Sequence, residues 1–399
     1  MAILNSKRLH NQRMRTCFYL ACLFILLVST VGQASAANGM PESNKFGYGM
    51  RIDPWGREVD FALNIAAQSG LDWIGIDFNW QEQWPEASRT LDLSPLNKSM
   101  TFAAENGLSV LLSITNPPEW ANTPQGPDPE MTSGLVAQFA RLYPGALKAV
   151  ELFPGANTRQ GWGAEANPLA YMKLIEKIAQ TLSAAQQDIA LVAAGLVPLT
   201  PPYNPGDMDD LLFLARLYEA GAAGRIPVVS LRLTSLHGEP LAAPWESELR
   251  VLRRYELVRN LMLENDHADG VIWLTGFSWP EMETTSGISS RLVSDKSMPD
   301  PLDDQVQWFS QAYQIIKSQL YIGAAFYGCL NPPALTDTHL SDQGCLIQLE
   351  NSRAVVHPAF TALSQAMALE DSYQAMISTG SGEVDIPFDP ESFPKSSTP

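Results

Sequence analysis

The chain has 399 residues, of which 45% are hydrophobic, so it is long enough to bury one large core or two ordinary ones. Ten Trp, 11 Tyr and 15 Phe are typical of a globular protein and argue against a disordered one. The net charge of −17 argues against nucleic acid and anionic membranes as partners, because an acidic surface repels both, whereas neutral or cationic partners fit.

The first 36 residues have the pattern of an export signal. Four basic residues come first, at Lys7, Arg8, Arg13 and Arg15. An apolar run over 17–28 follows, and Ala34, Ser35 and Ala36 form a small-x-small cleavage pattern. We therefore predict a signal peptide over 1–36, a short linker over 37–45, and a secreted or extracytoplasmic protein. An uncleaved membrane anchor is the weaker alternative, because the apolar run is well short of the roughly 20 residues that span a bilayer.

From residue 46 the sequence alternates short apolar runs with amphipathic segments, which predicts alternating strands and helices. Pro54 is expected in the first turn of the first helix, and Asn167 as the cap of the fourth. In chain order we expect strand 46–52, helix 54–69, strand 73–78, helix 95–106, strand 108–114, helix 129–142, strand 147–153, helix 168–187, strand 189–196, helix 208–220, strand 228–233, helix 245–265 (the longest), strand 270–274, helix 304–318, strand 320–326 and a last helix 358–369.

Eight strands alternating with helices, with no hairpin signal between them, predict parallel β/α units and match a (β/α)8 TIM barrel, a single domain over 46–371. A doubly wound open sheet is the competitor. No Gly-x-Gly-x-x-Gly turn follows the first strand, so we expect no dinucleotide cofactor. His237 is a lone histidine without metal-ligand spacing, so we expect no metal. The Ser, Thr, Gly and Pro content after 371 predicts a disordered tail over 372–399.

Four cysteines are present, and two of them, Cys17 and Cys22, lie in the predicted signal. Cys329 and Cys345 flank a Pro-rich loop. In an exported protein this predicts one disulfide between them, with two free buried thiols as the alternative.

The ends of the predicted strands carry few charges and many indole rings. In a β/α barrel function gathers at the C-terminal strand ends, and aromatic planes with polar edges are typical of a groove that binds sugars. The candidate ligand-binding residues are Trp80, Trp120, Asn157, Trp162, Trp279 and Tyr327. For each tryptophan the alternative is packing between barrel and helices.

Several segments, in this order, carry a family resemblance. They are Trp73-Ile-Gly-Ile-Asp-Phe-Asn-Trp80, Ile114-Thr-Asn-Pro-Pro-Glu-Trp120, Glu151-Leu-Phe-Pro-Gly-Ala-Asn157 followed by Trp162-Gly163 and Asn167-Pro-Leu-Ala-Tyr171, Ala194-Gly195-Leu196, and Trp273-Leu-Thr-Gly-Phe-Ser-Trp279. Together they resemble clan A retaining glycoside hydrolases, nearest the β-xylosidase and α-iduronidase branch, over about residues 46–330. The resemblance implies an oligosaccharide, polysaccharide or glycoside as ligand. It implies nothing about the oligomeric state.

In that family the fourth strand ends Trp-Asn-Glu-Pro-Asn, where Glu is the acid/base, and the seventh ends Thr-Glu-Phe-Gly-Trp, where Glu is the nucleophile. The two carboxyls must lie roughly 5 Å apart. Placed on this sequence, the acid/base position is Gly155 and the nucleophile position is Gly276. The Asn before the acid/base is Pro154, and an Arg that the family often carries on the second strand falls on Gly75. The resemblance therefore implies a barrel without the retaining machinery.

Three hypotheses follow. The first is an exported, non-catalytic carbohydrate-binding pseudoenzyme. The second is an active O-glycosyl hydrolase with relocated carboxylates, for which Asp77, Glu281 and Glu283 are the candidates, including an inverting pair roughly 6.5–9.5 Å apart. Glu151 is expected to lie too deep, about 13 Å further down the strand than Gly155. The third is a scaffold or interaction protein whose strand-end pocket is closed or filled.

Overall fold

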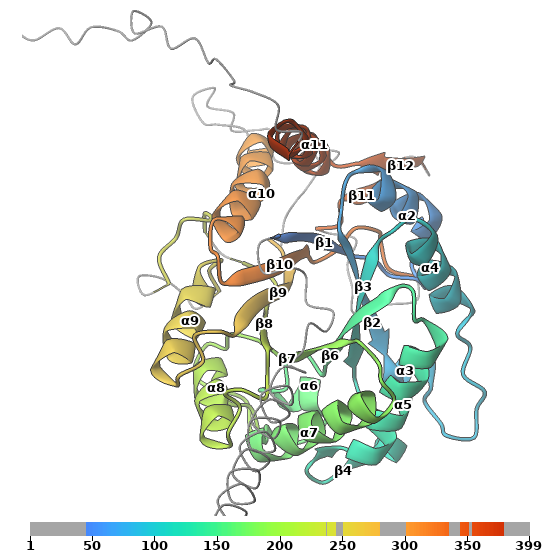
Figure 1. The fold of residues 1–399 in the computed structure, drawn as a ribbon, viewed down its shortest axis with the longest axis vertical. Coiled ribbons are helices and arrows are strands. Elements are labelled where there is room, and N and C mark those ends of the chain that lie inside the picture. Colours follow the sequence, from blue (N-terminus) through green and yellow to red (C-terminus); the bar gives the residue numbers. More distant parts are fainter. Residues whose placement is uncertain are drawn as a thin grey trace, which may run out of the picture. The chain divides into compact units, whose positions relative to one another are not determined.

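The structure is a computed structural model that describes residues 45–236, 238–244, 250–279, 301–334, 344–350 and 353–378. Within these residues eight parallel strands close into a barrel (Figure 1), which confirms the predicted (β/α)8 fold. The barrel strands are β1 (Gly47–Arg51), β2 (Trp73–Asn79), β3 (Ser109–Thr115), β6 (Leu147–Leu152), β7 (Ala190–Leu196), β8 (Val228–Leu233), β9 (Val271–Phe277) and β10 (Ile322–Tyr327).

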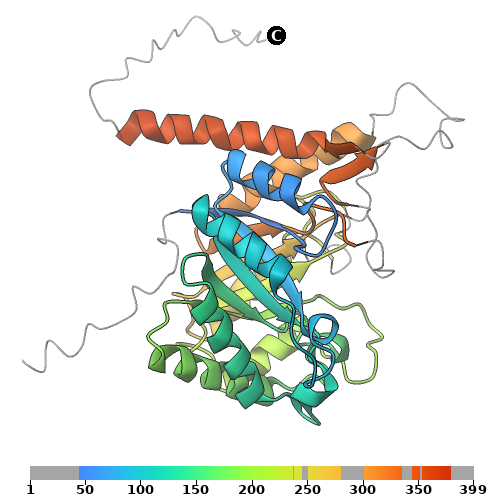
Figure 2. The same cartoon turned by 90° about the vertical axis from the view of Figure 1, so that its right-hand side faces the viewer.

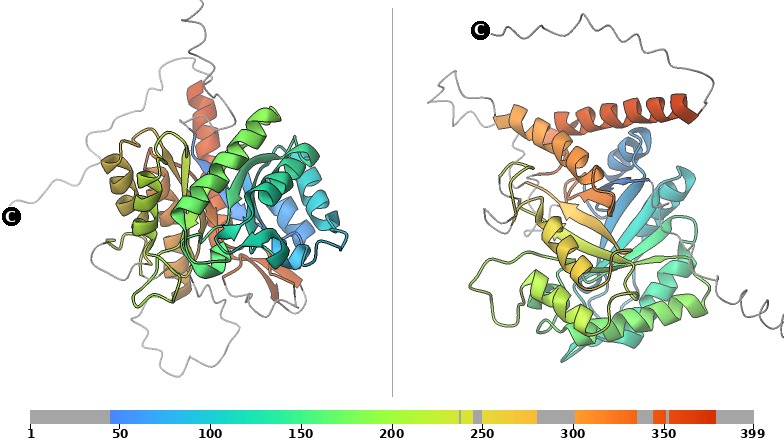
Figure 3. Two further views of the ribbon diagram at one scale, coloured as in Figure 1. Left: turned by 90° about the horizontal axis from the view of Figure 1, so that it is seen from below. Right: turned by 60° about the vertical axis from the view of Figure 1, so that its left-hand side comes forward.

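Helices follow the strands and surround the barrel (Figures 1 and 2). The longer ones are α2 (Val59–Gln68), α4 (Ser94–Glu105), α5 (Pro129–Leu142), α7 (Pro168–Ala184), α8 (Asp210–Glu219), α9 (Arg254–Glu264), α10 (Pro301–Lys317) and α11 (Pro358–Ser378). Two short helices, α3 (Trp80–Gln83) and α6 (Arg159–Trp162), follow β2 and β6 directly. Helices α5 and α7 pack together, as do α10 and α11 (Figure 3).

The barrel closes because β1 pairs with strands on both sides. Met50 is in register with Ile74 of β2 and with Tyr327 of β10. The order around the barrel is β1-β10-β9-β8-β7-β6-β3-β2, so each of these strands has two neighbours. Closure leaves no unpaired edge among them, and the barrel interior and the surrounding helices bury the two faces of the strands.

Helix caps match local sequence signals. The side chain of Asn167 accepts a hydrogen bond from the backbone N–H of Ala170, which confirms the predicted cap of α7. The side chain of Asp128 accepts from the N–H groups of Glu130 and Met131 at the start of α5, whose bounds agree with the prediction. These ends are set by neighbours in sequence, and sequence alone located them.

Two predicted helices begin too early. Residues 54–58 form turns, and Glu58 at the N-cap of α2 has a left-handed backbone (φ 58°), so the first helix starts at Val59. The helix predicted over 245–265 is helical from Arg254 to Glu264; residues 250–253 are not helical, and 245–249 lie outside the described residues. It is not the longest helix, since α7, α10 and α11 all exceed it.

The C-terminal part differs from the prediction in two ways. Helix α11 continues to Ser378, so helix replaces the first residues of the tail predicted over 372–399. Before it, β11 (Ile347–Glu350) and β12 (Arg353–Val356) form an antiparallel pair that the sequence did not signal, and β4 (Asn122–Thr123) pairs with β5 (Gly126–Pro127) in the same way. Residues 379–399, like the predicted signal and linker up to residue 44, lie outside the described residues.

Among the described residues, no helix combines the length and the apolar character needed to cross a bilayer.

The barrel interior has an apolar lower part and a polar upper part. Trp73, Trp273 and Phe326 pack against one another in the lower part, with the two indole centroids 5.1 Å apart. Side chains on one face of a strand recur every second residue. Two residues beyond Trp273, the strand places Thr275 inward, and Glu151 likewise follows Ala149. Strands β6 and β9 thus each deliver a polar side chain toward their C-terminal ends.

Candidate functional site

A cavity of about 1040 Å³ opens at the C-terminal ends of the barrel strands. Every barrel strand, or the loop behind it, contributes to its wall. The lining residues include Arg51, Asp53, Trp55, Asp77, Asn79, Glu82, Asn116, Pro154, Gly155, Arg159, Asp207, Arg232, Arg250 and Cys329. Among the described residues, Trp55 is the one aromatic residue of the wall. The volume suits a ligand of oligosaccharide size.

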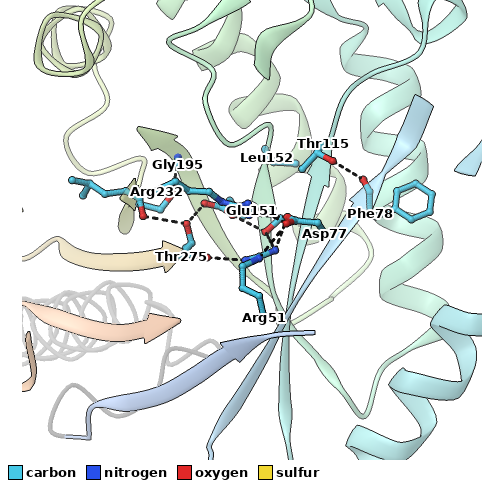
Figure 4. Close-up of polar contacts among 12 residues, drawn as sticks. Arg51, Asp77, Phe78, Thr115, Glu151, Leu152, Gly195, Arg232 and Thr275 are labelled. Atoms are coloured by element: carbon cyan, nitrogen blue, oxygen red, sulfur yellow. Dashed lines mark hydrogen bonds and ion pairs between the residues drawn. The ribbon is translucent and has the colours of Figure 1, made fainter. Parts of the chain in front are cut away.

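The floor of the cavity is a network of charged and hydroxyl side chains from six strands (Figure 4). Its members are Arg51 of β1, Asp77 of β2, Ser113 of β3, Glu151 of β6, Arg232 of β8 and Thr275 of β9. Two arginines and two carboxylates balance in charge, which is the condition under which a buried ionic cluster is tolerated.

Asp77 lies between the two guanidinium groups. Arg51 donates to it from Nη2 at 2.5 Å and from Nε at 3.2 Å. Arg232 donates from Nη2 at 2.8 Å and from Nη1 at 3.1 Å. Burial by itself would raise the pKa of Asp77, but the charges and hydrogen bonds of Arg232 and Arg51 lower it to about 2. Asp77 is therefore ionised and its charge is neutralised on both sides.

Glu151 lies beneath Asp77 and is fully buried. It accepts hydrogen bonds from Ser113 Oγ at 2.6 Å, from Arg232 Nη2 at 2.8 Å and from Thr275 Oγ1. Burial favours the protonated form, yet Arg232 and Arg51 together with these donors lower the pKa of Glu151. Glu151 does not line the cavity, which agrees with the prediction that it lies too deep in the barrel. It is therefore placed to hold Arg232 and not to touch a ligand.

The contact between Glu151 and Thr275 joins β6 to β9 across the barrel interior. These are the fourth and seventh barrel strands. Their C-terminal ends therefore face one another at a common mouth, as a glycosidase-like frame requires.

One arginine nitrogen bridges the two carboxylates. Asp77 Oδ1 and Glu151 Oε2 each accept from Arg232 Nη2 at 2.8 Å. The carboxylates are thus close, but both have lowered pKa values, and a glycosidase pair needs one member that still holds a proton. In addition Glu151 is closed off from the cavity. As it stands, this pair cannot supply acid and nucleophile to a bound glycoside.

The arginines have opposite shifts. Burial and the nearby charge of Arg232 lower the pKa of Arg51 to about 10, against the attraction of Asp77 and Glu151. Burial also acts to lower the pKa of Arg232, but Asp77 and Glu151 outweigh it and the net shift is upward. Both guanidiniums remain charged at neutral pH.

Gly155 and Gly276 are the positions to which the resemblance assigns the acid/base and the nucleophile; Gly155 lines the cavity, and Gly276 lies in β9 beside Arg51 and Arg232. Gly155 lines the cavity and has a left-handed backbone (φ 80°), and the nearest atom to a Cβ built on it is Thr158 Oγ1 at 3.5 Å. A Cβ on Gly276 would lie 3.7 Å from Cδ of both Arg51 and Arg232. Space for at least a methyl group therefore exists at both positions, and no carboxyl fills it.

The side chain of Arg51 lies beside Gly75. A Cβ on Gly75 would lie 3.0 Å from Arg51 Nη1 and 3.1 Å from Phe326 Cδ1. The side chain of Arg51, from the neighbouring strand, thus occupies the space beside the position where the resemblance expects an arginine. Arg51 was not predicted as a site residue. It ends the first strand and lies two residues beyond Gly49, which faces the barrel interior, so its side chain could have been expected to point inward as well.

Asp53 and Trp55 form the wall after β1 and were also missed. The side chain of Asn331 accepts from Asp53 N at 3.0 Å and donates to Asp53 O at 3.0 Å and to Arg57 O at 2.9 Å. Asp53 Oδ1 accepts from Trp55 N at 2.9 Å. Burial raises the pKa of Asp53 to about 6, an effect that the Trp55 N–H opposes and the charge of Glu82 adds to. A carboxyl that is partly protonated near neutral pH therefore faces the cavity.

The residues predicted to bind ligand lie elsewhere. Five of these residues are buried: Trp80, Asn157, Trp162, Trp279 and Tyr327. Trp120 is partly buried and packs against the core. Trp162 Nε1 donates to Gln125 O, and Tyr327 OH to Gly344 O. Asn157 holds the backbone of Val197 and Met208. None of the six lines the cavity. In this structure the four tryptophans pack against the core, and their contact with a ligand stays a prediction.

The remaining candidates divide in two. Glu281, Glu283 and His237 lie outside the described residues. The predicted disulfide between Cys329 and Cys345 is confirmed, with the two Cα atoms 4.6 Å apart, and both residues line the cavity. Among the described residues no group of three His, Cys, Asp or Glu side chains could hold a metal ion.

The barrel is similar to solved glycoside hydrolases. A family 39 glycoside hydrolase from Bacteroides cellulosilyticus WH2 matches 83% of this chain with a TM-score of 0.59 at 14% identity, and the match spans 66% of that protein, just under two thirds. The family 1 β-glucosidase from Thermotoga maritima matches 84% of this chain and 99% of its own, with a TM-score of 0.55 at 11% identity. The family 1 β-glucosidase from Exiguobacterium antarcticum B7 matches 84% of this chain and 99% of its own, with a TM-score of 0.54 at 9% identity.

At these identities the likeness shows the fold, a glycoside hydrolase-like TIM barrel, and confirms the predicted resemblance at that level. A scan against protein-family models and a search of curated proteins each find no match.

Proposed function

We propose that this chain is an exported, non-catalytic carbohydrate-binding barrel. The observation that carries the proposal is the pair Gly155 and Gly276. Gly155 lines the cavity just after the fourth strand, Gly276 lies in the seventh strand beside Arg51 and Arg232, and neither can donate a proton or attack an anomeric carbon.

The carboxylates that remain support the absence of turnover. Asp77 is bonded to two arginines and its pKa is lowered to about 2, so it cannot protonate a leaving group near neutral pH. Glu151 is enclosed by Ser113, Arg232 and Thr275. Both carboxylates serve the network in the floor.

The cavity supports binding of a saccharide. Trp55 offers an aromatic plane of the kind that packs on the C–H face of a pyranose ring. Around it, Asn79, Asn116 and Asp207 supply polar edges for hydroxyl groups. The described residues leave this space open, which favours ligand binding over the scaffold hypothesis, in which the pocket is filled.

Two measurements on the mature protein test the proposal. Calorimetric titration with xylo-, gluco- and manno-oligosaccharides should show saturable binding, with a change in tryptophan fluorescence. A panel of aryl-glycosides should show no turnover. Absence of heat and of fluorescence change at millimolar ligand would count against carbohydrate binding. Turnover of any aryl-glycoside would count against the non-catalytic assignment.

One observation favours a second candidate, a hydrolase with relocated carboxyls. Asp53, with its pKa raised to about 6, and Asp77, with its pKa lowered to about 2, line the same cavity. Carboxyls whose pKa values are pushed apart are typical of acid/base pairs. If turnover is found and is lost in both Asp53→Asn and Asp77→Asn, the hydrolase replaces the non-catalytic barrel.

A further inference from the structure

Arg250 differs from the other charged residues of the cavity wall. It lines the cavity in the segment between β8 and α9. Among the described residues, none forms a hydrogen bond or ion pair with Arg250, whereas Asp77, Asp207 and Arg232 in the same wall all have such partners. An arginine that points into a ligand-sized space without a partner of its own has all of its donors available.

The acidic residues of the same wall are already satisfied. Asp77 accepts from two guanidiniums. Asp207 accepts from the N–H of Arg159 and from Asn204 Nδ2, and Glu82 accepts from Asn79 Nδ2. Asp53 is held by Trp55 N–H and has a raised pKa. Each of these acidic residues thus has a hydrogen-bond donor other than Arg250, and Asp77 is in addition neutralised by two guanidiniums.

The cations of the wall are all arginines. Arg51 and Arg232 form the floor, Arg250 lies in the wall without a partner, and Arg159 makes a loose 3.4 Å contact with an exposed Glu165. The chain as a whole is strongly acidic, with 43 acidic and 26 basic residues, yet arginines and carboxylates are equal in number among the described residues that line the wall. The cavity therefore repels an anion less than the rest of the surface does.

We propose that the saccharide bound in this cavity is anionic, and that its carboxylate or sulfate group is received by Arg250. Guanidinium matches both groups because its planar donors form paired hydrogen bonds with two oxygens. The inference rests on the proposed carbohydrate binding and adds the class of sugar. Arg159 lies in the same wall and adds positive charge.

Calorimetric titration of the mature protein with three probes tests the proposal: xylotetraose, xylotetraose with a glucuronic acid branch, and xylotetraose sulfate. The charged probes should bind about tenfold or more tightly than the neutral one. The two charged arms separate a carboxylate preference from a sulfate preference. Raising the salt concentration from about 0.05 to 0.5 M should weaken the charged probes alone.

Arg250→Gln should remove the preference by weakening the charged probes about tenfold while neutral binding stays within about twofold. Arg250→Lys should keep part of it, and circular dichroism should report unchanged folding. Arg225→Gln is the matched control, because Arg225 pairs with Glu176 on the surface and does not line the cavity. Equal binding of neutral and charged probes by the unmodified protein, or equal loss of both in Arg250→Gln, would overturn the anionic assignment alone. Binding of no probe would overturn carbohydrate binding as well.

Discussion

A Cβ built on Gly276 would lie 3.9 Å from Nε of Arg232, the one nitrogen of that guanidinium without a hydrogen-bond partner among the described residues. Arg232 uses Nη1 and Nη2 on Asp77 and Glu151. The donor left over therefore faces the position at which the resemblance places a nucleophilic carboxylate. Among the described residues, no acceptor on β9 takes up this donor.

Alanine at the two mouth glycines should act in opposite directions. The backbone of Gly276 is not left-handed, and a Cβ added there would make ordinary van der Waals contacts. Gly276→Ala should therefore stabilise the fold by about 0.5 kcal/mol, because alanine lowers the entropy of the unfolded chain. Gly155→Ala should cost about 1 kcal/mol, because φ is 80° there although space is free. Urea unfolding measures both.

Gly195→Ala is the control for steric crowding. Its Cβ would lie 2.6 Å from Pro154 Cβ and 2.7 Å from Glu151 Oε1, with φ at 45°, so a loss of about 3 kcal/mol is expected. A loss for Gly276→Ala comparable to that of Gly195→Ala would show that the space beside Gly276 is not free.

Asp77→Asn should destabilise the fold near neutral pH, because it leaves two guanidiniums facing one neutral amide. The carboxylate side chain is 41% exposed, so we expect about 2 kcal/mol, less than for a fully buried pair. A lowered pKa means that the contribution is present above the unfolded pKa and is lost as pH falls through the folded one. The difference between wild type and variant should therefore shrink below about pH 4.

Urea unfolding at neutral and acid pH measures this difference. Glu219→Gln is the control, since Glu219 pairs with Arg216 on the surface and both side chains are more than half exposed. It should change stability by less than about 0.5 kcal/mol. Equal effects of the two substitutions would mean that the floor network contributes no more than a surface pair.

The barrel was predictable because its signals are local. Helix α5 and strand β8 have the predicted bounds, and Asn167 caps α7 through its own near neighbours. The turn over 54–58 was not predictable from the proline in it, because Asn331, more than 270 residues away, holds Asp53 and Arg57 in place. A contact of that range overrides the preference of Pro54 for a first helical turn.

The sequence predicted the place of the candidate site at the strand ends, but not most of the side chains that line it. Gly155 and Gly276 were located by their motifs, and Cys329 and Cys345 by their number and setting. The orientation of the tryptophans could not be predicted, because an indole at a strand end can turn to the cavity or to the helices, and sequence does not distinguish the two. Trp162 and Trp80 turned into the core, and Trp55, in a turn mistaken for helix, reached the wall.

Trp55→Ala should therefore weaken saccharide binding about tenfold and remove most of the ligand-induced fluorescence change. Trp55→Phe keeps a ring and should retain part of the affinity. Trp120→Phe is the matched control, because Trp120 does not line the cavity and bonds to Trp84 O instead. If Trp120→Phe lost binding and Trp55→Ala kept it, the strand-end tryptophans predicted from the sequence would be the ligand contacts after all.

Asp53→Asn should make the fold more stable than wild type above about pH 6. Folding raises the pKa of Asp53 from 3.8 to about 6 because burial disfavours its charge. A raised carboxyl pKa means that the folded state binds the proton more tightly, so wild-type stability falls as pH rises from about 4 to 6 and stays lower above it. Asparagine carries no charge and keeps the acceptor for Trp55 N–H. We expect a gain of about 1 kcal/mol at pH 7.5, allowing for partial exposure, and none at pH 4.

Urea unfolding of both proteins between pH 4 and 8 measures this gain. Asp60→Asn is the control, because the Asp60 carboxylate pairs with Lys98 and is 65% exposed, so its variant should not gain stability with pH. The same titration followed by saccharide binding links stability to function. If the protonated Asp53 donates a hydrogen bond to ligand, wild-type affinity should fall above about pH 6 while that of Asp53→Asn stays level. A gain of stability in Asp53→Asn that is the same at pH 4 and pH 8 would show that the carboxyl does not titrate in this range.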